Sequence, residues 1–168
     1  MRQQYPFLVA AVLCSISGCV PASDAQLEAN KEVVRRFAEA QNNGDIESLN
    51  EVLAPDVVRH CQATPDVEIR SREDFVRFFE ASSAVFSNAR VTIDIMVAEG
   101  DMVATYGSFT GTQDGRLGLF PPTGKGVDSK FLSIARLEAG KIAELWVEWD
   151  NLGILTQLGH FPPIEDGG

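Results

Sequence analysis

The spacing of apolar residues changes once along the chain, from a helical period to alternation. In residues 25–42 the apolar side chains recur every three or four positions, which predicts a helix. A second, shorter helix is expected to begin after Asp45 and to end at Pro55, because aspartate caps helix starts and proline stops helices. The phenylalanines of residues 71–83 fall on one side of a third predicted helix.

The second half of the chain has the two-residue period of half-buried strands. Apolar residues occupy every odd position of 91–97, so we expect these side chains to share one face. A short turn leads to a second strand over 102–112, and after a loop residues 127–137 and 142–150 predict a long hairpin. Further apolar residues predict a short helix or turn that ends at Gly159.

The order of these elements indicates the fold class. Helices followed by a run of antiparallel strands indicate an α+β fold with the helices on one face of the sheet. A twisted sheet of long strands that curls over helices forms a cone with an apolar cavity. Such cavities are where small ligands bind.

The hairpin loop decides where Arg136 points. A three-residue loop over 138–140 would place Arg136 on the same face as Asp150, whereas a two-residue loop would turn it outward. We expect the outward orientation.

The N-terminus has the features of an export signal. Residues 1–18 contain a basic residue, an apolar run too short to span a membrane, and then small residues. The signal ends in a Gly-Cys pair that resembles the bacterial lipobox, which implies a lipoprotein with acylated Cys19 and a tether over 19–26. The residue after Cys19 is not aspartate, so the resemblance favours the outer membrane, facing the periplasm. Ordinary cleavage after Ala22 is the alternative.

Charge and cysteine content narrow the function classes. The chain has a formal net charge of −10, which becomes −11 when Arg2 is lost with the signal. The sequence has no run of Lys and Arg, and neutralising phosphates needs a basic patch, so an anion-binding or nucleic-acid role is not expected. Cys14 leaves with the signal and Cys19 is acylated, so Cys61 remains alone and no intrachain disulfide can form.

Several segments resemble the SnoaL-like polyketide cyclase (ester cyclase) family of the nuclear transport factor 2-like superfamily. In chain order they are "LAPDVVRH", "VAEGDMVATYGSFTGTQDG", "PPTGKGV" and "LEAGKIAELWVEWDNLGILTQLG". The similarity implies one SnoaL-like domain over residues 27–160, with residues 161–168 as a tail. It also implies a cone-shaped α+β barrel, commonly oligomeric, that uses neither a metal nor an organic cofactor.

The resemblance makes Asp150 the first catalytic candidate. In characterised cyclases of this family an aspartate at this position is the acid/base for intramolecular aldol closure, and related isomerases and epoxide hydrolases use the same cavity for other reactions. If the strand stays regular, Trp146 and Glu148 share the parity of Asp150 and would face the same cavity. The alternative is that Asp150 caps the helix that follows.

His60 is the second catalytic candidate, because an imidazole there could donate to an enolate oxygen; the alternative is a structural histidine bonded to the backbone. The two histidines lie far apart in a sequence without a His/Cys/Asp cluster, so we expect no metal site. The expected pocket lining, whose aromatic members could equally be core, is Phe79, Tyr106, Phe109, Phe131, Trp146 and Glu148.

Three functions remain open from the sequence. The first is a cofactor-independent acid/base enzyme, a cyclase-like lyase or isomerase, that acts on a small apolar carbonyl compound. The second is a lipid-anchored protein that binds such a ligand without chemistry. The third is an interaction module that uses the open face of the sheet, which would require a large exposed apolar patch.

Overall fold

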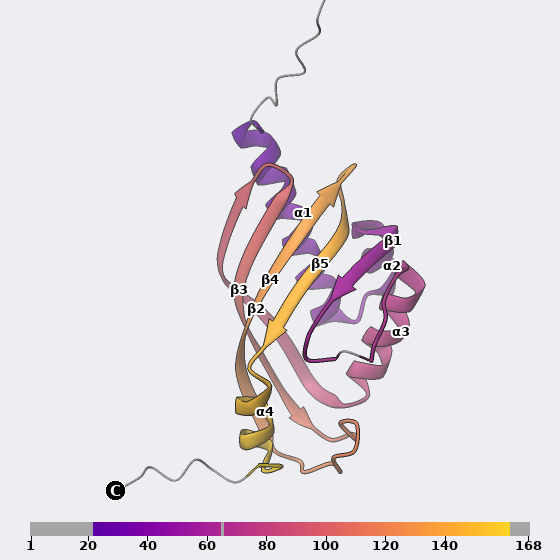
Figure 1. Ribbon diagram of the computed structural model, residues 1–168, viewed down its shortest axis with the longest axis vertical. Helices are drawn as coiled ribbons and strands as arrows, with labels where there is room; N and C mark the ends of the chain where they lie inside the picture. The colour runs from indigo at the N-terminus through magenta and orange to yellow at the C-terminus, as the bar shows by residue number, and fades with distance from the viewer. Residues whose placement is uncertain (1–21, 65, 162–168) are drawn as a thin grey trace, which may run out of the picture.

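The computed structural model describes residues 22–64 and 66–161, and within them three helices precede the long strands (Figure 1). The elements in chain order are α1 (Asp24–Asn43), α2 (Ile46–Val52), β1 (Leu53–His60), α3 (Arg72–Ser83), β2 (Phe86–Glu99), β3 (Met102–Gln113), β4 (Gly126–Glu138), β5 (Lys141–Trp149) and α4 (Asn151–Leu158). The α+β class predicted from the sequence is therefore confirmed.

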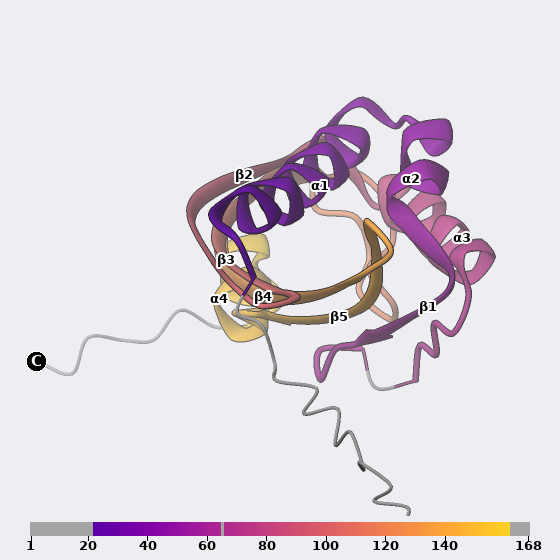
Figure 2. The ribbon, with the colours of Figure 1, turned by 90° about the horizontal axis from the view of Figure 1, so that it is seen from above.

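The strands of the described residues form one mixed sheet in the order β1-β5-β4-β3-β2. Neighbouring strands are antiparallel except β1 and β5, which pair in parallel. Seen from above, the sheet curls around α1, while α2 and α3 lie beside β1 (Figure 2). We call the side of the sheet that packs on α1 the concave face and the opposite side the outer face.

A core between α1 and the concave face joins the helices to the sheet. It contains Val34 and Phe37 from α1 and Val103, Ala135 and Leu145 from three adjacent strands, all buried. Burying a side chain of the size of valine, leucine or phenylalanine stabilises a fold by about 1.5–3 kcal/mol. The core therefore fixes which side chains of β3, β4 and β5 point into the concave face.

The boundary between α2 and β1 differs from the prediction. The helix ends at Val52 rather than Pro55, and Pro55 lies within β1. Strand β1 is at the edge of the sheet, and its pairing with β5 is irregular between Leu53 and Val58. Proline is tolerated in such a segment because its missing N–H breaks no regular ladder bond.

A β-bulge in β2 changes the faces that alternation predicts. The register with β3 shifts between Ile93 and Ile95, so that Ile93 packs against the core while Ile95 and Val97 are exposed on the outer face. The expectation that the odd positions share one face was therefore wrong beyond Ile93. One extra residue in a strand reverses the facing of every residue after it.

The β4–β5 hairpin closes with two residues, Ala139 and Gly140, both with positive φ (49° and 75°). Arg136 lies across from Glu144 on the outer face, and its Nε donates to a Glu144 carboxylate oxygen at 3.2 Å. The expected outward orientation of Arg136 is confirmed.

The facing predicted for Trp146 and Glu148 was wrong. Leu145 and Val147 are buried on the concave face, so by alternation Trp146 and Glu148 point to the outer face, and Trp149 points inward. The predicted facing assumed that the strand stays regular up to Asp150, but β5 ends at Trp149. Trp146 and Glu148 are therefore not part of the cavity wall that was expected on the concave side.

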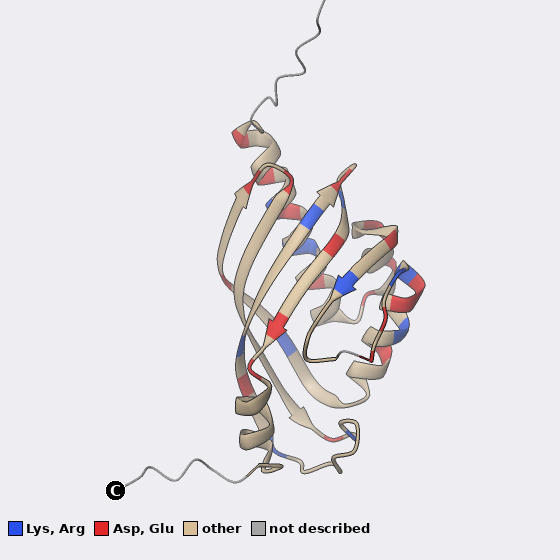
Figure 3. Cartoon of the chain, in the orientation of Figure 1, with Lys and Arg blue, Asp and Glu red and all other residues tan. Residues whose placement is uncertain are grey.

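The predicted signal, the Cys19 anchor and all but the first residue of the predicted tail lie outside the described residues. Among residues 22–64 and 66–161, no helix combines the length and apolar character that a membrane span requires. Acidic and basic residues are intermixed along the helices and strands, as Figure 3 shows.

Candidate functional site

Four aromatic rings lie together on the concave face and form what we call the concave aromatic cluster: Phe86, Phe109, Phe131 and Trp149. The ring centroids of Phe109 and Trp149 lie 5.7 Å apart, and those of Phe131 and Trp149 lie 5.0 Å apart. Phe131 rests on the bare backbone of Gly107, where a Cβ would lie 2.5 Å from the ring. Phe109 and Phe131 were named from the sequence as lining, whereas Trp149 was missed.

Thr105 is a buried polar residue next to this cluster. Its side chain is on the concave face of β3, between Val103 and Gly107, and only 2% of the residue is exposed. No described residue forms a hydrogen bond with its Oγ1. Leaving a buried hydroxyl unpaired costs about 1–3 kcal/mol, so such a group is a candidate contact for a ligand. Thr105 was not among the residues predicted from the sequence, although it lies two positions from Val103 and so shares its face.

Asp150 caps helix α4. Its Oδ1 accepts a hydrogen bond from the Gly153 amide at 2.9 Å, and the residue is exposed. Gly153 has no Cβ, and one there would collide with the carboxylate. The capping alternative is thus confirmed, and the carboxylate lies in solvent directly after Trp149 rather than inside an enclosed hollow.

His60 lies on the outer face, in what we call the outer charged network of His60, Glu144 and Arg136. Its ring stacks on Trp146 with centroids 5.2 Å apart, and its Nε2 is 2.8 Å from a Glu144 carboxylate oxygen. The bond from His60 holds the pKa of the Glu144 carboxyl below its ordinary value, and the bond from Arg136 adds to the effect. The network joins β1, β5 and β4.

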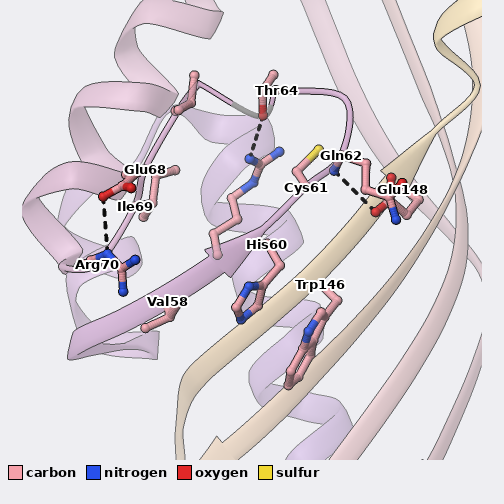
Figure 4. Close-up of a pocket in the computed structure, with 12 residues that line it drawn as sticks. Val58, His60, Cys61, Gln62, Thr64, Glu68, Ile69, Arg70, Trp146 and Glu148 are labelled. Carbon is pink, nitrogen blue, oxygen red and sulfur yellow. Dashed lines mark hydrogen bonds and ion pairs between the residues drawn. The ribbon is translucent and has the colours of Figure 1, made fainter.

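A pocket of about 490 Å³ opens beside the edge strand β1 (Figure 4). His60, Trp146 and Glu148 line it together with Arg59 and Cys61. Three of the predicted site residues are thus brought together, but beside the outer edge of the sheet. A second pocket, of about 390 Å³, is also on the outer side, next to Arg136 and Glu144.

The remaining predicted residues, Phe79 and Tyr106, line neither of these two pockets. Phe79 is half-buried against the core, and Tyr106 is exposed on the outer face because it alternates with buried Thr105. Over the described ranges, no group of three or more His, Cys, Asp or Glu side chains is arranged to hold a metal ion.

Helices packed in the concavity of a strongly curved mixed sheet define the cone-shaped α+β class of the nuclear transport factor 2-like proteins. The structure of a SnoaL-like protein from Jannaschia sp. CCS1, a proposed polyketide cyclase, has this fold. It superimposes with a TM-score of 0.75 at 22% identity, over 84% of this chain and 99% of that one.

The family model of the SnoaL-like polyketide cyclases matches residues 31–158, and the chain belongs to this family. IdmH from Streptomyces antibioticus, a proposed polyketide cyclase, is 32% identical over 77% of this chain and 98% of its own, with a TM-score of 0.69. TsrD from Streptomyces laurentii is 27% identical over 83% of this chain and 99% of its own, with a TM-score of 0.73. A search of curated proteins gives no match.

Proposed function

We propose that the protein binds a small apolar carbonyl compound against the concave face and acts on it by acid/base chemistry without a cofactor. Membership of the SnoaL-like family supports this reaction class, which includes aldol-type cyclisation, isomerisation and hydrolysis. The observation that carries the proposal is the Thr105 hydroxyl, buried without a partner among the described residues, next to the concave aromatic cluster. Apolar walls with a few polar groups are typical of small-molecule sites.

In this proposal Thr105 and Asp150 have complementary roles. The Thr105 hydroxyl donates to a carbonyl oxygen of the ligand and anchors it. Thr105 lies level with Val147 across β4, three residues before Asp150, so the carbonyl that it binds is remote from the carbon that reacts. One Asp150 oxygen caps α4, and the other, Oδ2, has no hydrogen bond to a described residue and takes the proton from the carbon between two carbonyls. In a cyclisation the enolate carbon then bonds to a second carbonyl carbon, and the alkoxide so formed takes up a proton.

His60 has no part in this chemistry. It lies on the outer face, on the opposite side of the sheet from Thr105, so the two cannot contact one small ligand. We therefore propose no catalytic role for His60.

The Asp150→Asn variant tests the proposed reaction. Asparagine caps helices as well as aspartate does but cannot accept the proton, so we expect turnover to be lost while folding and ligand uptake persist. The measurement is mass-spectrometric detection of products from a panel of β-ketoesters and enones. Turnover equal to that of the wild-type protein would rule out Asp150 as the base.

A binding protein without catalysis is the second candidate function. The observation that favours it is that Asp150 is exposed and is already accounted for as the cap of α4. On this view the concave face binds the same class of ligand, and no compound of the panel is converted. Uptake by the wild-type protein with no product from any compound would favour this candidate.

We also propose that the protein is exported and anchored in the outer membrane, facing the periplasm, by a lipid on Cys19. The proposal depends on the apolar run and the Gly-Cys pair of the sequence. Mass spectrometry of protein from a bacterial membrane fraction should find an acylated N-terminal peptide that begins at Cys19, and Cys19→Ser should abolish it. A mature chain that begins at Ser23 would instead show ordinary cleavage after Ala22.

A second copy of the chain is the partner we propose for the outer face. Two rows of apolar side chains cross neighbouring strands there and form what we call the outer apolar patch: Ile95, Val97, Tyr106, Leu132, Ile134 and Trp146. Ile95, Val97 and Leu132 are each about 60% exposed. Contiguous exposed apolar side chains on a sheet are typical of an interaction surface.

A further inference from the structure

Arg59 is buried to an extent that is unusual for a charged residue. It is the one charged side chain among the buried polar residues of the described chain, with 9% of its surface exposed. Neighbouring Val58 and His60 point to the outer face, whereas Arg59 points away from it toward α3. Its guanidinium packs over the Phe78 ring, 4.6 Å from the centroid.

The charge of Arg59 has no counter-ion within the described part of the chain. Its Nη1 donates to Thr64 Oγ1 at 3.2 Å, but no described carboxylate oxygen lies within 4.0 Å of the guanidinium. Glu148 is the carboxylate whose charge favours the charged form of Arg59, but it forms its hydrogen bond with the Gln62 amide. Burial lowers the pKa of Arg59, since it penalises the charged form. Besides Thr64, the side chain of Cys61 lies within reach of the guanidinium and favours its charged form. A guanidinium has five N–H donors, so capacity remains for a further partner.

The pocket beside β1 gives a ligand access to this guanidinium. Arg59, Cys61 and Thr64 line it, and its volume of about 490 Å³ is that of a small-molecule site. Apolar Val67 and Ile69 form another part of the wall. The pocket therefore combines a buried cation with apolar surface, which matches a ligand that has one charged end and an apolar body.

We infer that this pocket binds a small organic acid through its carboxylate, with Arg59 as the anchor. The planar fork of a guanidinium fits the two oxygens of a carboxylate and forms strong, charge-assisted hydrogen bonds with them. Glu68 and Glu148 also line the pocket and disfavour more highly charged anions such as phosphate. The site lies apart from the concave face, so the inference does not depend on the proposed reaction.

The inference refines the expectation drawn from composition. A net charge of −10 excludes extended polyanions that need a basic patch, and it weakens the long-range attraction of any anion. A single desolvated guanidinium acts at contact distance, where the overall charge has little influence. One carboxylate in a pocket is therefore compatible with an acidic protein.

Calorimetric titration of the full chain with benzoate, and with benzamide as its uncharged analogue, tests the inference. We expect the wild-type protein to bind benzoate about tenfold or more tightly than benzamide, because only benzoate pairs with Arg59. Arg59→Met should remove this preference. Arg70→Met is the matched control, because Arg70 lines the same pocket but is exposed and paired with Glu68 at 3.3 Å. Equal binding of the two compounds by the wild-type protein would overturn the inference.

Alkylation of Cys61 gives a second readout that needs no variant. Cys61 is a half-buried free thiol in the pocket wall, so bound benzoate should slow its reaction with iodoacetamide, whereas benzamide should not. Peptide mapping by mass spectrometry separates Cys61 from the two N-terminal cysteines. Arg59→Met should also unfold at the same or a higher temperature, since it removes an unpaired buried cation. Alkylation of Cys61 that benzoate leaves unchanged would contradict the site. A marked loss of stability in Arg59→Met would also contradict it, because it would show that Arg59 has a structural role.

Discussion

Asp150 has a structural role at the end of β5 whether or not it has a chemical one. Its carboxylate bonds the Gly153 amide, and the missing side chain of Gly153 leaves room for it. A helix start with a side-chain acceptor satisfies one of its free amides. Capping and catalysis can be separated by substitution. Asparagine at position 150 can still cap the helix but cannot act as a base, and alanine can do neither.

The two substitutions should therefore differ in stability. Asp150→Asn should change the free energy of unfolding by less than about 0.5 kcal/mol, and Asp150→Ala should lower it by about 0.5–2 kcal/mol. Urea denaturation followed by circular dichroism measures both. Ser71→Ala, which removes the equivalent cap of α3, provides a reference value. Equal losses in the asparagine and alanine variants would show that the cap contributes little.

Thr105 presents the opposite case, a polar group that we expect to destabilise the unliganded protein. Thr105→Val removes the unpaired hydroxyl and keeps the shape, so we expect the free energy of unfolding to rise by about 1 kcal/mol. Thr110→Val, at an exposed position of the same strand, should change it by less than about 0.5 kcal/mol. The same Thr105 variant should bind carbonyl ligands more weakly. A loss of stability together with unchanged ligand binding would show that the hydroxyl has a hidden partner.

At the level of elements, the order of the strands and their hairpins followed from the sequence, but several boundaries and strand faces did not. Strand β2 begins at Phe86 rather than near residue 91, and the helix before β1 ends at Val52. Both faces of β5 carry large apolar residues. Leu145, Val147 and Trp149 point to the concave face, and Trp146 points to the outer face. The alternation of side chains along a strand does not show which of two such faces packs on α1. The β2 bulge after Ile93 has no marker such as glycine, so it too was invisible in the sequence. Most of the wrong predictions concern the candidate site, because its residues were assigned to a face from their odd or even positions in the strand.

The outer charged network, which ties three strands together, should make stability depend on pH. A carboxyl whose pKa is lower in the folded than in the unfolded state stabilises the fold above its unfolded pKa, near 4.5 for Glu144, and this contribution is lost as the pH falls through the folded value. The wild-type protein should thus lose more stability between about pH 5 and pH 3 than Glu144→Gln does. Urea midpoints across this range measure the difference. An unchanged slope in Glu144→Gln would contradict the role of the network.

At the scale of the whole molecule, the order of helices and strands was sufficient to predict the α+β class, because long alternating strands must bury one face. The pockets and the residues that line them could be found only from the structure. The pocket beside β1 is formed by segments far apart in the sequence, including Arg59 and Trp146, and only the parallel pairing of β1 with β5 brings them together. A sequence pattern contains no record of such pairing.

The outer apolar patch predicts the assembly state. We expect light scattering of the wild-type protein to give the mass of a dimer, and Leu132→Glu to give a monomer, because a buried unpaired carboxylate is costly. Leu119→Glu is the matched control, since Leu119 is 91% exposed in a loop and is not part of the patch. A wild-type protein that is monomeric at high concentration would show that some other partner, or none, covers this face.

The parallel pairing of β1 with β5 also affects when the protein can fold. Strand β1 lies early in the chain, yet within the described residues its ladder partner is the last strand. A ribosome-bound chain that has not yet released β5 leaves β1 without its ladder partner, although α2 and α3 can already pack on it, and contacts between such distant segments form slowly. Completion of the sheet must therefore wait until β5 has left the ribosome, and until then the earlier strands lack the neighbour that closes the sheet over β1.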